Sequence, residues 1–150
     1  MHRTRTRATT RRARSLAVLA VAAALAVSAV AVPMALARGS KTVAGEATAA
    51  SLHKTVLTNT KGLTLYTLSG ETHGKFICTG ACLKAWPPLL VAAGTKPKGP
   101  VALGTIKRPE GKTQVTFKGA PVYTFSGDSK KGEANGEDLK DVGVWHAVTP

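Results

Sequence analysis

The sequence is poor in acidic residues, in aromatic residues and in cysteine. It contains 8 Asp and Glu against 21 Lys and Arg, only 5% aromatic residues, and two cysteines in 150 residues. With 43% hydrophobic residues the chain is too apolar for a disordered protein, and its length admits only one ordinary globular domain. Two cysteines allow a single disulfide, so a disulfide-rich scaffold is excluded.

Recognised catalytic and nucleic-acid-binding patterns are also missing. No Ser/His/Asp arrangement stands in a known motif, no glycine-rich phosphate loop is present, and no two carboxylates share a predicted strand face. We therefore expect no catalytic residues, no cofactor and no enzyme. The lysines stand mostly singly, without the interleaved aromatic residues of a nucleic-acid-binding stripe. Nucleic acid is thus not an expected partner.

The first 37 residues have the order of an export signal. Six arginines precede an apolar run over residues 16–32, and Ala35-Leu36-Ala37 then provides an A-x-A site. We predict a signal peptide over residues 1–37, removed after Ala37 by Sec export. A twin-arginine signal fits less well, because Arg14 stands where that motif has an apolar residue. The alternative is a retained anchor, since the run approaches the roughly 20 residues that span a bilayer.

No cysteine lies at the end of the leader, so the cleaved chain has no site for a lipid anchor. We expect a secreted or wall-associated protein without stable membrane insertion. After cleavage 15 Lys and Arg face 8 Asp and Glu, a net charge of +7. This charge serves solubility, or it attracts anionic cell-envelope components.

Two regions differ in composition after the leader. Residues 38–51 are rich in Ala, Gly, Ser and Thr and are predicted to be a flexible tether. Short β-favouring runs separated by turn residues then fill 52–150, which predicts a mainly β domain with antiparallel strands, sandwich or barrel-like. The predicted strands are Thr55–Thr58, Leu63–Leu68, Val101–Ile106, Gln114–Phe117, Val122–Phe125 and Val142–Val148. A hairpin turn is expected at Arg108–Lys112, and one short helical segment at 81–86, before two prolines.

An internal repeat organises this domain. Residues 61–71 (KGLTLYTLSGE) align without a gap to residues 118–128 (KGAPVYTFSGD), and each is followed by a tryptophan. We predict two β-rich units, over about 52–92 and 101–150. Period-2 alternation places Tyr66 and Leu68 on one face of their strand, and Tyr123 and Phe125 on the equivalent face of theirs. These two faces should meet in a shared core. The motif residues are Tyr66, Leu68, Glu71 and Trp86 in the first unit, and Tyr123, Phe125, Asp128 and Trp145 in the second.

The Tyr-x-aromatic-x-x-Asp pattern, complete at Tyr123, Phe125 and Asp128, resembles the bacterial secreted-repeat family, predicted lipoproteins of unknown function. The similarity covers nearly all of residues 55–148. The first unit departs from the pattern with Leu68 and Glu71, and the lipidated cysteine is absent. The resemblance implies no particular chemistry, because no activity is established for the family.

Cys78 and Cys82 most simply form one disulfide in an oxidising compartment. Helical spacing would hold their Cβ atoms too far apart, so Gly80 should break the chain into a tight turn. Two functional alternatives remain: thiol exchange, and a Cu(I) or electron-transfer site with His73 or His146 as a further ligand.

The two histidines and an acidic cluster complete the candidate residues. His73 and His146 lack a second ligand at a recognised spacing and are interpreted as surface or packing residues. The cluster lacks EF-hand spacing and is interpreted as a solvated loop balanced by lysines; its members are Asp128, Glu133, Glu137, Asp138 and Asp141. Each motif carboxylate, Glu71 and Asp128, is expected to accept backbone N–H groups one or two residues further on.

Taken together, these patterns predict a non-catalytic secreted or cell-envelope module whose ligand the residues do not identify. The alternative is an envelope accessory for metal binding or electron transfer that uses Cys78, Cys82 and a histidine.

Overall fold

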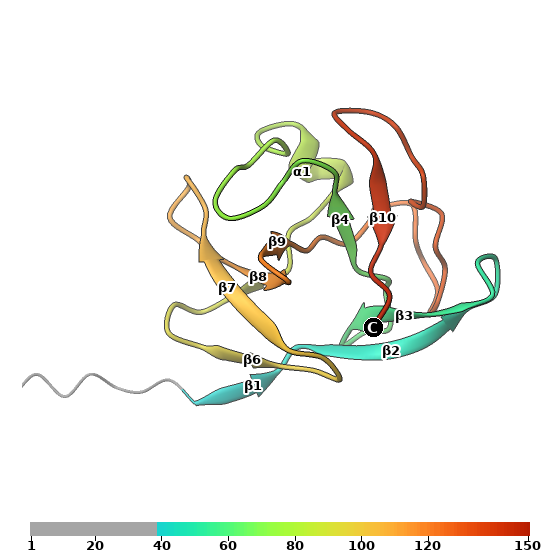
Figure 1. The fold of residues 1–150 in the computed structure, drawn as a ribbon, viewed down its shortest axis with the longest axis horizontal. Coiled ribbons are helices and arrows are strands. Elements are labelled where there is room, and N and C mark those ends of the chain that lie inside the picture. The colour runs from blue at the N-terminus through green and yellow to red at the C-terminus, as the bar shows by residue number, and fades with distance from the viewer. Residues whose placement is uncertain (1–38) are drawn as a thin grey trace, which may run out of the picture. The chain divides into compact units, whose positions relative to one another are not determined.

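The computed structural model describes residues 39–150 and shows a mainly β domain with one short helix (Figure 1). The predicted signal peptide and its cleavage site lie outside the described residues. The elements in chain order are β1 (Ser40–Thr42), β2 (Ala44–Ala49), β3 (Lys54–Asn59), β4 (Tyr66–Leu68), α1 (Cys82–Ala85), β5 (Leu90–Val91), β6 (Lys96–Lys98), β7 (Leu103–Lys107), β8 (Thr113–Phe117), β9 (Ala120–Pro121) and β10 (Trp145–Ala147).

The strands form several small sheets. β2 pairs with β3 and β4 with β10, while β8 lies between β5 and β7 and also pairs with β9. These pairs are antiparallel as predicted, whereas β1 and β6 run parallel. Within residues 39–150 the strands form no closed barrel.

The predicted tether is also wrong, because most of it is strand. β2 pairs with β3 along its whole length, from Ala44 opposite Asn59 to Ala49 opposite Lys54. Ala44 and Ala49 are buried although their side chains are small. A strand of small residues needs a partner to be stable, and here β3 supplies the hydrogen bonds and the apolar contacts. Composition alone gave no sign of that partner.

The predicted turn and helix are confirmed. Gly111 N–H donates to Arg108 O at 2.9 Å, and the φ of Gly111 is +79°, which glycine adopts without strain. α1 ends immediately before Trp86, Pro87 and Pro88. The predicted strand Val122–Phe125 is not regular, because its ladder is reduced to bridges that join Tyr123 to Tyr66 and to Pro88.

In each repeat, the segment around the tryptophan pairs with the tyrosine strand of the other repeat. β10, from the second repeat, pairs with β4 of the first. In the opposite direction, the segment beside Trp86 pairs with the second tyrosine strand: Thr124 N–H donates to Pro87 O at 2.9 Å, and Ser126 N–H to Ala85 O at 2.8 Å. The two repeats are therefore interlocked rather than placed side by side.

The adjoining backbone follows the same approximate two-fold symmetry. In each half three residues form a closed ring of N–H···O bonds, in which every residue donates once and accepts once. The rings are Leu57, Leu65 and Val148 in one half, and Val115, Val122 and Leu89 in the other. In each ring one residue comes from the partner repeat.

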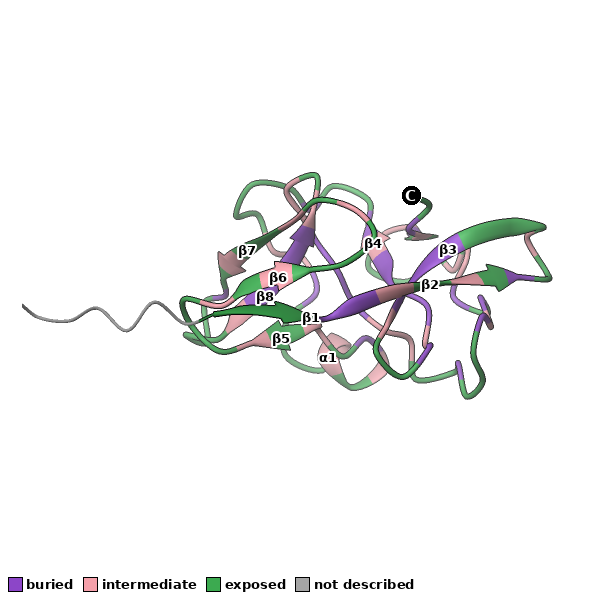
Figure 2. Cartoon of the chain, turned by 90° about the horizontal axis from the view of Figure 1, so that it is seen from below, coloured by how far each residue is buried: buried purple, intermediate pink, exposed green. Residues whose placement is uncertain are grey.

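Burial follows from this interlocking. Figure 2 shows β8 and much of β3 and β4 buried, whereas β1 is exposed along its length. The aliphatic part of the core centres on Leu57, Leu65, Val115 and Val122. A second, aromatic part, called here the aromatic cluster, contains Tyr66, Leu68, Cys78, Trp86, Tyr123 and Trp145, with Phe125 packed against it.

The exchange of segments predicts that neither repeat folds by itself. The separate fragments 39–100 and 101–150 should each lack a cooperative unfolding transition in circular dichroism, because each leaves a tyrosine strand without its partner. Mixing the two fragments should restore the transition. Cooperative unfolding of either isolated fragment would contradict the interlocked arrangement.

Candidate functional site

The two motif tyrosines pair with each other, backbone to backbone, where the two repeats meet. Tyr66 N–H donates to Tyr123 O at 2.8 Å, and Tyr123 N–H donates to Tyr66 O at 2.9 Å. Both residues are 0% exposed. The predicted equivalent, buried tyrosines and shared core are therefore confirmed.

Each tyrosine hydroxyl crosses to the carboxylate of the other repeat. Tyr66 Oη donates to Asp128 Oδ2 at 2.6 Å, and Tyr123 Oη donates to Glu71 Oε2 at 2.8 Å. Both carboxylates are buried, at 6% and 2% exposure. Burial is the main cause, and the hydrogen-bonded carboxylate the second, that raises the pKa of both tyrosines well above the usual range. Both phenols are therefore protonated.

The second oxygen of each carboxylate closes the loop that follows it. Glu71 Oε1 accepts the N–H groups of Ile77 and Cys78, both at 2.6 Å, and Asp128 Oδ1 accepts Asn135 N–H at 3.0 Å. The expected bonds to N–H groups one or two residues on are therefore wrong. The carboxylates point into the core, so they meet the far end of a long loop instead of their own turn.

A buried arginine distinguishes the first carboxylate from the second. The Arg108 side chain is 1% exposed and donates to Gln114 Oε1 at 2.6 Å, to Tyr123 Oη at 3.1 Å and to Cys78 O at 2.9 Å. It reaches Glu71 through the shared Tyr123 hydroxyl, so this carboxylate has a cation nearby. Sequence reasoning missed Arg108, because its position in a hairpin turn indicated an exposed residue.

Asp128 receives no bond from Arg108. Burial raises the pKa of Asp128 above its usual value, although Tyr66 and the Asn135 N–H oppose the shift. The ionised form of Asp128 is therefore a cost to the folded state.

The two tryptophans stack face to face between the tyrosines. The rings of Trp86 and Trp145 are 3.7 Å apart with an interplanar angle of 9°. One carboxylate holds both indoles: Asp141 accepts Trp86 Nε1–H at 2.9 Å and Trp145 Nε1–H at 2.8 Å. Burial opposes ionisation of Asp141, but the indole and backbone hydrogen bonds lower its pKa below the usual value. The predicted pairing of the tryptophans is confirmed, whereas the role of Asp141 was missed.

Cys78 and Cys82 form the predicted disulfide, with a Cα–Cα distance of 5.3 Å. Gly80 has a φ of +55° and makes the predicted break between them. Because the two sulfur atoms bond each other, neither is a free thiolate for a metal or for exchange. The sulfur-based alternative therefore finds no support in this geometry.

The acidic loop is only partly the solvated, lysine-balanced segment that we predicted, because Asp128 is buried while Asp138, Asp141 and the three lysines are exposed. Glu133 Oε2 accepts the N–H groups of Ser129 and Lys130. Glu137 accepts Ala147 N–H, which ties the loop to β10.

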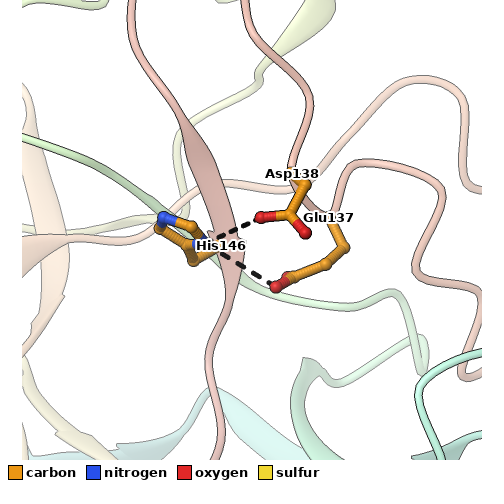
Figure 3. A group of neighbouring side chains, drawn as sticks. All are labelled: Glu137, Asp138 and His146. Carbon is orange, nitrogen blue, oxygen red and sulfur yellow. Dashed lines mark ion pairs between the residues drawn. The ribbon is translucent and has the colours of Figure 1, made fainter.

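His146 faces outward from β10, toward Glu137 and Asp138 (Figure 3). Its Nδ1 lies 3.6 Å from Glu137 Oε1 and 3.6 Å from Asp138 Oδ1, so a protonated imidazole forms ion pairs with both. These residue types can bind a divalent ion, and their donor atoms lie within 4.8 Å of one another. The imidazole and Asp138 are exposed, which fits a surface ion-pair group. His73 is also exposed, beside Thr72.

Comparison with known proteins relates the second repeat to a family. Residues 104–149 match the family model described as a secreted repeat of unknown function. This part of the chain is therefore similar to that secreted-repeat family. No curated protein and no solved structure matches the chain. In this chain the motif tyrosines and carboxylates join the two repeats.

The family description supports an exported location. Among residues 39–150, no helix has the length and the apolar character needed to cross a membrane.

Replacing Glu71 by Asp tests the crossed pairs. The shorter side chain cannot reach Tyr123 Oη and the Ile77 and Cys78 N–H groups together. Glu71→Asp should therefore lower the free energy of unfolding by about 1–3 kcal/mol in denaturant titrations, although it makes the two motifs more alike. A neutral or stabilising effect would mean that the carboxylate acts only in its local turn.

The raised pKa of Asp128 predicts a dependence of stability on pH. The contribution of Asp128 to the free energy of unfolding should be fully present below its unfolded-state pKa of about 3.9. It should be lost as pH rises through its folded-state pKa. The stability difference, wild type minus Asp128→Asn, should therefore fall as pH rises in that window. Asp141→Asn is the matched control. Because the pKa of Asp141 is lowered, the stability difference between the wild type and this variant should rise with pH instead. Parallel curves for the wild type and Asp128→Asn would contradict this assignment.

Proposed function

We propose that this protein is a non-catalytic module of the cell envelope or extracellular space that binds anionic envelope polymers through exposed lysines. The observation that carries the proposal is the unequal burial of charge. All 13 lysines of residues 39–150 are exposed, whereas two of the eight acidic residues, Glu71 and Asp128, are buried in the aromatic cluster. Because Arg108 is buried as well, folding makes the surface more basic by one net charge than the composition indicates.

The basic charge is concentrated on one part of the chain. No acidic residue occurs over residues 72–109, a range that includes α1 and β5–β7. β1 and β6 form an exposed two-stranded ribbon, called here the lysine ribbon, with Lys41, Lys96 and Lys98. Lys96 and Lys98 lie two residues apart and share a face, while Lys41 lies on the other face. The ribbon therefore presents positive charge to both sides.

The interior supports a scaffold rather than an enzyme. The motif carboxylates, both tyrosine hydroxyls and the Arg108 guanidinium are engaged with one another below the surface. Groups held this way maintain a rigid module and leave the exposed side chains to make contacts. A flexible phosphate polymer fits the lysine ribbon better than a shaped ligand does, because it needs charge without a fixed geometry.

Charge reversal on the lysine ribbon tests the proposal, with poly(glycerol phosphate) as the probe. A triple variant Lys41→Glu, Lys96→Glu, Lys98→Glu should bind at least about 100-fold more weakly, since each lysine near an anionic surface contributes about 1 kcal/mol and each glutamate adds repulsion. The matched control reverses three exposed lysines of the acidic loop, Lys130, Lys131 and Lys140. Isothermal titration at low and at physiological salt measures the polymer affinity of the two variants and of the wild type. An equal loss of affinity in the two variants would contradict a localised surface, and no binding by the wild type would contradict the proposal.

A further inference from the structure

All tyrosines and tryptophans of the chain belong to one continuous series of ring contacts. The sequence has two of each. Ring centroids are 5.4 Å apart from Tyr66 to Trp86, 3.7 Å from Trp86 to Trp145 and 5.2 Å from Trp145 to Tyr123. All four residues are 0% exposed. The stacked tryptophans thus form the centre of the series and the tyrosines form its two ends.

Every polar hydrogen of this series is donated to a carboxylate. The phenols donate to Asp128 and Glu71 at 2.6 and 2.8 Å, and both indoles donate to Asp141 at 2.9 and 2.8 Å. Buried Tyr and Trp need a hydrogen-bond acceptor, but a neutral carbonyl meets that need without the cost of burying a charge. Carboxylates differ in one respect: at about 2.6–3.2 Å they can also take the proton.

The same side chains are the most easily oxidised groups of the domain. Residues 39–150 contain no methionine, and both cysteines are bonded in the disulfide. A one-electron oxidant that meets this domain outside the cell therefore has the tryptophans and tyrosines as its reductants. The indole N–H edges lie beneath Asp141, which is itself exposed. An oxidant at the surface is thus closest to the tryptophan pair.

We propose that the aromatic cluster is a proton-coupled relay that moves a one-electron oxidation from the tryptophan pair to Tyr66. The oxidant, an organic radical or a high-valent metal complex, takes one electron from the stacked indoles, and the indole N–H proton moves to Asp141. Tyr66 then gives one electron to the indole radical, its phenolic proton moves to Asp128, and the indole recovers its proton from Asp141. In the balanced result the oxidant has gained one electron, Tyr66 is a neutral radical and Asp128 is protonated.

The surroundings of the two tyrosines favour Tyr66 as the end of the relay. Arg108 donates to Tyr123 Oη, and its positive charge opposes proton transfer to Glu71. Asp128 has no bond from that cation and is held in a site that favours its protonated form. The Tyr66–Trp86 and Tyr123–Trp145 ring distances are nearly equal, at 5.4 and 5.2 Å, so the proton acceptor is the difference that selects Tyr66.

Flash photolysis of the exported protein tests the relay, with photogenerated ruthenium(III) tris-bipyridine as the oxidant. Transient absorption should show a tryptophan radical whose decay matches the growth of a tyrosyl radical, and this step should slow in D₂O. Freeze-quench electron paramagnetic resonance should assign the final radical to tyrosine. A tryptophan radical that decays without a tyrosyl signal would overturn the proposal.

Two matched variants locate the end of the relay. Tyr123→Phe leaves Tyr66 as the single tyrosine and should keep most of the tyrosyl signal, whereas Tyr66→Phe should lose most of it. Equal losses in the two variants would contradict the assignment to Tyr66. If Tyr66→Phe does not fold, Tyr123→Phe alone decides, because a tyrosyl radical in that variant comes from Tyr66 and its absence contradicts the relay. Polymer binding by the lysine ribbon is independent of these outcomes.

Discussion

A buried carboxylate is stable only when its oxygens are supplied with hydrogen-bond donors, and in this protein the two repeats supply them to each other. Each motif carboxylate receives a phenol from the opposite repeat and backbone N–H groups from its own loop. One side chain thereby fixes the position of a loop and the position of the other repeat. The sheets are too small to fix these positions, since several of their strands are only two or three residues long.

The disulfide acts on the same network more than on chain entropy. Closing so short a loop contributes little through the unfolded state. Its effect is local, because the backbone of Cys78 donates to Glu71 and accepts from Arg108. The bridge therefore holds in place the segment on which the first carboxylate and the buried arginine both depend.

The sequence predicted the parts of the fold that a local pattern determines. The Arg108–Lys112 turn, the helix before Pro87 and the equivalence of the two motif tyrosines each have a short-range signal, and the structure confirms them. β2 and the roles of Arg108 and Asp141 escaped prediction, because each depends on a partner distant in sequence or on burial. The carboxylates were identified, but their bonds were assigned to the nearest N–H groups, while the fold directs them inward.

The interlocked tryptophan segments have a consequence for how such a chain can arise. A protein with a single repeat would have no segment of its own to pair with its tyrosine strand, and a second copy could supply that segment by reciprocal domain swapping. The present two-repeat chain has the arrangement of such a swapped homodimer with its two subunits joined in one chain. Joining the subunits removes the dependence on concentration and allows the two halves to differ, as Glu71 with Arg108 and Asp128 without it do.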